Sequence, residues 1–528
     1  MSRAHEPWAW VAVTASTAVS IALFVGYPFQ PMQDLGHHMA IAAIVADYTH
    51  IDSLYPAIYE AMNPLQANSL LYSVASGFAR FMTVTHAVLL SLALSFAALS
   101  LTTAFALRQS RLSIWGAVLT PALVHSLIFV AGFANLLFAL PLMVLALPLH
   151  DALLRRPTLG RGAALSLTLV LLFLAHAHAF LWVGAVLAVL SLGAFTRAAW
   201  RFLRATQIPT TPGIFLQGSA ALGAALPSLF LFASWYHRTF GAGRTEGGVL
   251  ASTAGWSSGF GASFRTLSES VRDLPAFVFN TTQDDSDLNF VVAAAVVAGV
   301  SVVACPGRKR APRFMQVAFA LTFASYFFLP EGLQGHDIVA SRQPALALLF
   351  LPALLSPPAF TRAPRRHICV VAMLLAAGVY HFATWQKLLH AFDLKEIAGL
   401  PEVLAAAPPR KRLHHVKLDP GSAFFGWRPM WHVEKFYMSS KLGQTADTPA
   451  VLSTGALRVR TGVDVHRLTS HSAYWPQDRE VWEYFDLVLV RRWAPPPGML
   501  EVAEKHAHLL SKHGDWELWE RNPGAHGK

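Results

Sequence analysis

Residues 8–27 of the chain read WAWVAVTASTAVSIALFVGY, an apolar stretch of 20 residues without a charged side chain. As an α-helix, it is long enough to cross the roughly 30 Å hydrocarbon core of a bilayer. Arg3 precedes the stretch, as in a secretory signal peptide, but no small-residue cleavage site separates it from polar sequence. We therefore expect an uncleaved first transmembrane helix.

The composition of the whole chain extends this expectation. The protein has 528 residues, of which 54% are hydrophobic and 13% are charged, and its mean hydropathy is +0.42. Soluble globular proteins carry about 25% charged residues, so these values exclude a soluble enzyme, a disordered chain and a fibrous protein. They predict a polytopic membrane protein. Two cysteines, Cys305 and Cys369, are too few for a disulfide framework.

Ten further apolar segments read as membrane spans, which predicts about eleven transmembrane helices in total. The ten segments are 85–107, 112–131, 133–149, 162–176, 178–196, 214–235, 289–305, 314–329, 342–360 and 367–386. A twelfth segment, 68–83, contains several polar residues and Arg80. We expect it to lie at the outer membrane interface rather than to cross the bilayer.

The basic residues favour this count, because Lys and Arg collect on the cytoplasmic side of membrane proteins. With a cytoplasmic N-terminus, eleven spans place five basic loops on one side, namely 108–111, 155–161, 197–204, 308–313 and 362–366. The same rule divides 162–196 into two short spans that turn near His176 and His178. The net charge of +11 is therefore a topology signal, and no nucleic-acid partner is expected.

An odd number of spans places the C-terminus on the outer side of the membrane. Loops 28–84, 236–288 and 330–341 then lie on that side, together with the segment 387–528. We expect an all-α transmembrane domain over residues 1–386 and a small extracytoplasmic domain over residues 387–528.

The pattern of the C-terminal segment is that of an α/β domain. Residues 484–490 form an apolar run that reads as a buried strand, and residues 498–513 have helical spacing. Residues 516–519 alternate in the manner of a closing strand.

The first outer loop carries the densest candidate site. Asp34 comes about seven residues after the first span, and in a helix His37 and His38 share its face. An acid and two imidazoles can act as a general base or hold a cation beside a phosphate. The alternative is a helix start that Asp34 caps, with both histidines in solvent. Leu35, Met39, Ile41 and Ala42 are expected against the membrane surface.

The late segment 330–344 is the second candidate. Arg342 is its only basic residue and opens an apolar span from the outer side, against the positive-inside bias. We expect it to hold an anionic lipid head or phosphate or to pair with an acid of the first loop; a snorkelling interfacial arginine is the alternative. His336 and Asp337 lie in the same segment.

Two weaker candidates remain. His176 and His178 stand at the outer end of two spans, where ionisable groups usually face a polar cavity, although simple interfacial histidines are as plausible. The acids between Asp284 and Asp287 can bind a divalent cation, although a solvated loop end is the commoner arrangement. The sequence contains no P-loop, and its few midplane charges argue against an ion-coupled transporter or flippase.

In its order of parts, the chain resembles the GT-C superfamily of membrane glycosyltransferases, in an uncharacterised bacterial branch. The resemblance rests on Asp34 in the first outer loop, on Arg342 at the start of a late span and on the external C-terminal domain. Three short motifs add to it, namely Gly132-Phe133-Ala134-Asn135 with Pro141-Leu142, His176-Ala177-His178 and Pro429-Met430-Trp431-His432.

The resemblance implies an enzyme that moves a sugar from a polyprenyl-phosphate donor to an extracytoplasmic glycan, lipid or protein acceptor. It implies the inner membrane of a bacterium, with the N-terminus in the cytoplasm and the C-terminal domain in the periplasm. Asp34 would act as catalytic base or cation ligand, which makes a divalent cation a candidate cofactor, and Arg342 would hold the lipid phosphate. The other candidate substrate-binding residues are His37, His38, His176, His178, His336 and Asp337.

This chain departs from the family at one point, because many members carry two adjacent acids where it has Gln33-Asp34. The alternative function is a non-enzymatic GT-C-like scaffold or lipid carrier in cell-envelope assembly. The two functions differ in whether Asp34 and Arg342 converge on one site, because catalytic groups must come within hydrogen-bond reach of the substrate.

Overall fold

Apolar helices dominate the computed structural model, which describes residues 6–204, 212–240, 262–279, 281–303, 311–333, 339–357, 360, 363–446, 456–460, 462–463, 484–491 and 499–522. Within these residues, seven helices are long and apolar enough to cross a membrane. They are α1 (Glu6–Gly26), α5 (Val84–Gln109), α8 (Ala134–Arg155), α10 (Ala177–Arg204), α11 (Pro212–Phe240), α13 (Ser286–Val303) and α17 (Pro364–Phe392). They support the expected multi-pass membrane protein.

The other four predicted spans are shorter or broken. Two are the helices α9 (Leu159–Ala175) and α14 (Arg313–Phe328). The other two ranges are each divided into short pieces, three of which carry a proline in the first turn. The pieces are η2 (Ile114–Leu119), α6 (Thr120–Val124) and α7 (Leu127–Val130), then α15 (Gln343–Leu348) and α16 (Pro352–Leu355). The total of eleven spans stays a prediction.

Two local expectations agree with the structure. Segment 68–83 contains α4 (Leu70–Phe78), whose nine residues extend about 14 Å and are too short to cross a bilayer. The range 162–196 is divided where expected, because α9 ends at Ala175 and α10 begins at Ala177. Between them, His176 is extended, with φ −162° and ψ 112°.

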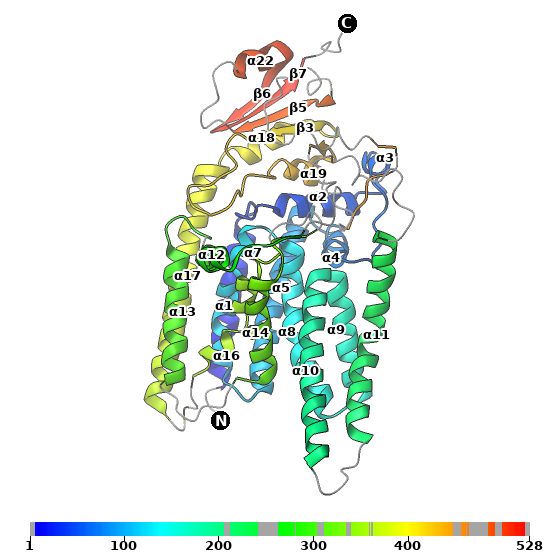
Figure 1. The fold of residues 1–528 in the computed structure, drawn as a ribbon. Helices are drawn as coiled ribbons and strands as arrows, with labels where there is room; N and C mark the ends of the chain where they lie inside the picture. The colour runs from blue at the N-terminus through cyan, green and yellow to red at the C-terminus, as the bar shows by residue number, and fades with distance from the viewer. Residues whose placement is uncertain are drawn as a thin grey trace.

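The helix α2 (Leu35–Ala46) lies in a layer between the long helices and the C-terminal sheet (Figure 1). It packs against α4, α5 and α19 (Lys435–Lys441), and Met39 and Ala43 are fully buried. The expectation that Met39 and Ile41 lie against the membrane surface is therefore wrong, because α2 is enclosed by protein. The short helix α3 (Tyr55–Ile58) follows in the same layer.

The C-terminal part contains a five-stranded sheet in the order β4-β3-β5-β7-β6. β3 is parallel to β4 and β5, whereas β7 is antiparallel to β5 and β6. The sheet lies at the end of the molecule opposite the N-terminus (Figure 1). Its strands are β3 (Arg412–Val416), β4 (Gln444–Thr445), β5 (Leu487–Arg491), β6 (Ala507–His513) and β7 (Trp516–Arg521).

Both strand expectations for this region agree with the structure, at β5 and β7. The helix expected over 498–513 is half wrong. The described part of that range begins with α22 (Met499–His506), but the chain then turns into β6, because residues 507–513 pair with β7.

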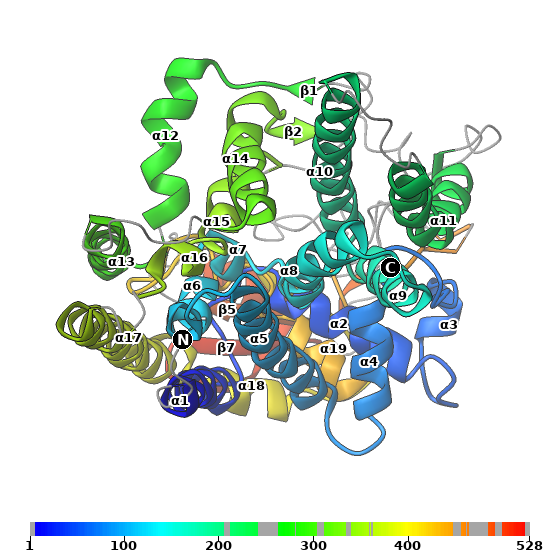
Figure 2. The ribbon, with the colours of Figure 1, turned by 90° about the horizontal axis from the view of Figure 1, so that it is seen from below.

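The remaining elements join the parts. η3 (Asp393–Ile397) and α18 (Leu400–Ala406) follow α17, and α18 packs against β6 and β7. β1 (Ala262–Ser263) pairs with β2 (Gly332–Leu333), and α12 (Leu267–Phe279) follows β1. Seen from the N-terminal end, α8 lies among α5, α9 and α10 (Figure 2). One continuous apolar core extends from α1 through α2 to β7.

Candidate functional site

Asp34 lies immediately before α2, at the N-cap position, but its side chain makes no capping hydrogen bond. Its carboxylate instead faces His432, with 3.5 Å between Asp34 Oδ1 and His432 Nε2. The alternative of a simple cap is therefore not what the structure adopts. The side chain of Asp34 is 29% exposed and that of His432 is 6% exposed, so the contact is open on one side only.

His37 completes a cluster of three possible metal ligands with these two residues. One ligand atom from each of Asp34, His37 and His432 lies within 4.8 Å of the others. The rings of His37 and His432 are stacked, with their centroids 3.7 Å apart. His432 precedes α19, so nearly 400 residues of chain separate it from Asp34.

Two glycines allow this close approach. A Cβ atom on Gly36 would lie 2.0 Å from the carbonyl oxygen of His432. A Cβ atom on Gly132 would lie 2.3 Å from the backbone nitrogen of Asp34, and Gly132 has a positive φ of +82°. The Asp34-Leu35-Gly36 and Gly132-Phe133 stretches therefore contact one another or the His432 segment directly. A larger residue at either glycine would separate them.

His38 points away from this cluster. Its Nδ1 atom lies 2.7 Å from the hydroxyl of Tyr72, and Asn135 Nδ2 donates to the same hydroxyl at 3.1 Å. Burial lowers the pKa of His38 to about 4, so the ring is neutral at pH 7. His38 therefore links α2, α4 and α8 rather than extending the face of Asp34 and His37 as expected.

A buried carboxylate, Glu434, stands behind His432. Its Oε1 atom lies 3.9 Å from His432 Nδ1, and its Oε2 atom lies 3.1 Å from His415 Nδ1. Burial alone would raise the pKa of Glu434, but Lys417, Lys435 and the two histidines outweigh it and hold that pKa well below its ordinary value. An ionised carboxylate therefore lies 3.9 Å from Nδ1 of His432, while Nε2 of the same ring faces Asp34.

The donor set fits a divalent cation. Two imidazoles and one carboxylate form a ligand type typical of zinc and of other transition metals that keep open positions. Ligands of a tetrahedral zinc ion are about 3.4 Å apart when the metal–ligand bonds are about 2.1 Å. The 3.5 Å separation of Asp34 Oδ1 and His432 Nε2 is of this size.

Arg342 lies close to this cluster through Phe133. Its guanidinium carbon is 4.5 Å from the centre of the Phe133 ring, and the residue is 8% exposed. Phe133 directly follows Gly132, which contacts Asp34. The structure thus places Asp34 and Arg342 against consecutive residues of the segment before α8.

Of the histidines at the break between α9 and α10, His178 contacts the residue next to Arg342. His178 Nε2 is 3.2 Å from Gln343 Nε2, next to Arg342 in sequence. His176 Nδ1 accepts from the backbone of Ala179 and so caps the start of α10. His336 and Asp337 lie outside the described residues.

The acids between Asp284 and Asp287 are not a cation site in the described structure. The Asp287 carboxylate accepts hydrogen bonds from the backbone and hydroxyl of Thr281, both at 2.7 Å, and from the hydroxyl of Thr282 at 3.1 Å. It thereby holds the turn before α13.

Sequence reasoning found Asp34, His37 and Arg342 but gave no role to His432. The Trp431-His432 pair appeared only as part of a motif. The one local signal for a role of His432 is that its polar ring stands among buried neighbours. Nothing in the sequence indicates that this ring reaches the first outer loop.

Fold and site together define a multi-pass membrane protein with a carboxylate–imidazole cluster between its helices and its sheet. No family model and no curated protein matches the chain. Among solved structures, it is similar to the crystal structure of the oligosaccharyltransferase of Archaeoglobus fulgidus in complex with zinc and sulfate. The sequences are 12% identical, the match covers 94% of this chain and 71% of that one, and the TM-score is 0.41.

Proposed function

We propose that the protein is a membrane glycosyltransferase that moves a sugar from a polyprenyl-phosphate donor to an extracytoplasmic acceptor. The observation that carries the proposal is that Asp34 and Arg342 lie against consecutive residues of the short segment before α8, with His37 and His432 beside Asp34. Asp34 and Arg342 contact Gly132 and Phe133, respectively. An enzyme requires Asp34 and Arg342 to lie at one site, whereas a passive scaffold does not.

In the proposed reaction, Asp34 accepts the proton of the acceptor hydroxyl as that oxygen attacks the sugar. The bond between the sugar and the phosphate oxygen breaks, and negative charge develops on the phosphate. Arg342 stabilises that charge in a site from which most water is excluded. His432 and Glu434 orient the Asp34 carboxylate. A divalent cation held by Asp34, His37 and His432 would add positive charge near the phosphate.

The proposed setting is a bacterial inner membrane. The N-terminus lies in the cytoplasm and the sheet lies in the periplasm, where a lipid-linked donor can meet a glycan, lipid or protein acceptor. The basic loops support this orientation through the positive-inside rule.

Sugar transfer by the purified protein tests the proposal. The protein in phosphatidylcholine nanodiscs is mixed with radiolabelled polyprenyl-phosphate sugars and a membrane extract as acceptor source. We expect turnover by the wild type and a loss of at least about 100-fold in Asp34→Asn, because a positioned base contributes about 10²–10⁴. Asp273→Asn, at an exposed pair with Arg272, is the matched control and should keep full activity.

Full turnover by Asp34→Asn would overturn the catalytic assignment. Tight binding of polyprenyl phosphate without transfer from any donor would favour the non-enzymatic lipid carrier.

A further inference from the structure

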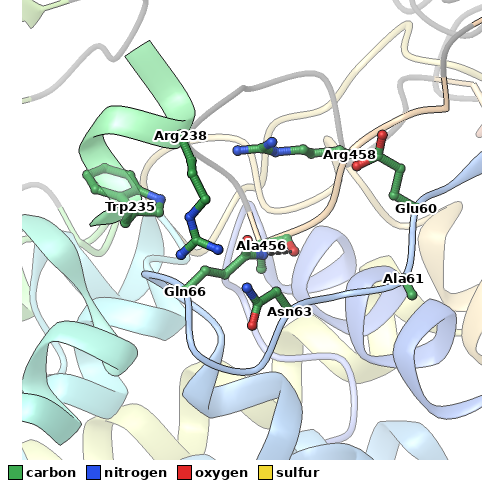
Figure 3. Close-up of a pocket in the computed structure, with 8 residues that line it drawn as sticks. All are labelled: Glu60, Ala61, Asn63, Gln66, Trp235, Arg238, Ala456 and Arg458. Carbon is green, nitrogen blue, oxygen red and sulfur yellow. Dashed lines mark hydrogen bonds between the residues drawn. The ribbon is translucent and has the colours of Figure 1, made fainter. Parts of the chain in front are cut away.

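A polar pocket lies where the end of α11, the loop after α3 and residues 456–460 meet (Figure 3). None of the residues considered above lines it. The side chains that matter for its chemistry are Glu60, Asn63, Gln66, Trp235, Arg238 and Arg458.

Hydrogen bonds between distant segments hold the walls of this pocket in place. The backbone N–H of Glu60 donates to the carbonyl of Arg458 at 2.8 Å, and that of Arg460 donates to the carbonyl of Ile58 at 2.9 Å. The amide of Gln66 donates to the carbonyl of Ala456. Arg458 also donates to the Thr239 hydroxyl near the end of α11, at 3.4 Å. The pocket is therefore preorganised.

The lining has the chemistry that recognises a sugar ring. Guanidinium, amide and carboxylate groups carry in-plane donors and acceptors that match neighbouring hydroxyls. Trp235 adds an apolar wall. It is 7% exposed and packs on Phe232, with 5.9 Å between ring centroids. The lining thus combines five polar or charged side chains with one aromatic wall.

The charge of the lining favours an acidic sugar. Among the described residues that line the pocket, Arg238 and Arg458 are the two basic side chains and Glu60 is the one acid, as Figure 3 shows. Arginine forks match carboxylate and phosphate oxygens in pairs. A neutral sugar would leave this positive excess without a partner from the ligand.

The pocket and Asp34 lie at opposite ends of α2. Tyr48, just beyond the C-terminal end of α2, donates to the carbonyl of Tyr59 at 3.0 Å and accepts from Arg460 at 3.2 Å. Asp34 precedes the other end. The 12 residues of α2 extend about 18 Å, a distance that several linked sugars can bridge but a single sugar cannot.

We propose that this pocket binds an acidic sugar unit, with a carboxylate or a phosphate, in a glycan whose reacting end lies at Asp34. Only the place of the reacting end rests on the proposed function. The binding itself depends on Arg238, Arg458 and Trp235.

Binding of defined oligosaccharides tests this proposal separately from turnover. The full-length protein in phosphatidylcholine nanodiscs is titrated by calorimetry with a short oligosaccharide that ends in glucuronic acid. The same oligosaccharide with that unit reduced to glucose is the comparison, and glucose 1-phosphate is a second arm that separates phosphate from carboxylate. We expect the acidic ligand to bind at least about tenfold more tightly than the neutral one.

The variants place the ligand in the pocket. Arg238→Gln and Arg458→Gln should each weaken acidic-sugar binding at least about tenfold, whereas Arg238→Lys should lose less because it keeps the charge. The exposed Arg272→Gln is the matched control. The titration contains no sugar donor and measures no transfer, so a failed transfer assay leaves this test intact.

Equal binding of the acidic and neutral oligosaccharides would overturn the proposal. It would also be overturned if the pocket variants bound the acidic ligand as the wild type does. A third outcome is also decisive. If the protein binds no sugar but binds phosphatidylglycerol, and Arg238→Gln abolishes that binding, the pocket is a lipid headgroup site.

Discussion

At the scale of single residues, the cluster around Asp34 depends on how His432 is held. Its ring stacks on His37 on one face, and the buried Glu434 lies behind its Nδ1 atom. A carboxylate behind a ligating imidazole fixes the ring orientation and raises its basicity. This arrangement leaves Nε2 of His432 toward Asp34, as the proposed cation site requires.

Cation binding follows from this geometry. We expect the purified, chelator-treated protein to bind one equivalent of zinc, and His432→Ala or Asp34→Asn to weaken that binding at least about tenfold. Affinity should fall as the pH is lowered, because the imidazoles must be neutral to bind. Calorimetry measures both effects. His508→Ala, at an exposed ring near Glu520, is the control, and equal zinc affinity in His432→Ala would refute the cluster.

Gly132 predicts a steric effect. Gly132→Ala introduces a Cβ atom 2.3 Å from the Asp34 nitrogen at a φ of +82°, which should destabilise the fold by about 1–3 kcal/mol. Thermal unfolding in detergent measures it. Gly160→Ala in α9, where a Cβ would meet nothing within 4 Å, should be neutral or stabilising. Equal melting temperatures for the two variants would contradict the close contact.

Sequence reasoning succeeded for residues whose partners are near in the chain. Asp34 and His37 are three residues apart on one helix face, and both enter the cluster. His38 was grouped with them, but its side chain turns toward Tyr72. His432 was missed as a partner because its contact with Asp34 depends on the path of nearly 400 intervening residues, which no local pattern encodes.

At the scale of elements, the link between α2, α4 and α8 passes through His38, Tyr72 and Asn135. Burial raises the pKa of the Tyr72 hydroxyl as it lowers that of His38. The three side chains are therefore neutral over the physiological pH range. They supply hydrogen bonds between three helices whose other buried side chains at this contact are mainly apolar.

This link predicts a pH dependence of stability. The pKa of His38 is about 4 when folded and 6.5 as its ordinary value, so between these values the unfolded chain binds more protons. Stability is full above pH 6.5 and falls as the pH drops toward 4, by up to about 3 kcal/mol. His38→Gln does not titrate, so its melting temperature should fall less between pH 7 and pH 5. Parallel losses in both proteins would show that His38 is not responsible.

Two of the predicted membrane spans are broken into short helices in the structure. The apolar composition of 112–131 and 342–360 predicted one continuous span in each range. Pro352 begins α16 after α15 has ended, and Pro121 lies in the first turn of α6, but the gap between α6 and α7 at His125 and Ser126 contains no proline. The break at His176 was found from the distribution of arginines, without any glycine or proline to mark it.

At the scale of the whole molecule, the long helices were predictable because hydropathy is a strong and local signal. Seven of the expected spans are long apolar helices. The strands β5 and β7 were also expected. The layer formed by α2 and α19 was not, because its apolar residues look the same whether protein or lipid covers them.

The orientation of the molecule is testable with cysteine labelling. In a chain with Cys305→Ser and Cys369→Ser, a cysteine replacing Ser511 in β6 should react with a membrane-impermeant maleimide in intact cells. A cysteine replacing Ser110, between Arg108 and Arg111, should react only after the cells are permeabilised. The reverse pattern would place the sheet in the cytoplasm and remove the site from a periplasmic acceptor.

The contact between Asp34 and His432 also determines when, during synthesis, the cluster can form. Asp34 leaves the ribosome early, whereas His432 is made 398 residues later. At about 5–20 residues per second, this delay is roughly 20–80 seconds. During that time the membrane helices can insert while the cluster lacks its third member. The cluster is thus incomplete until the segment before α19 has emerged and folded onto α2.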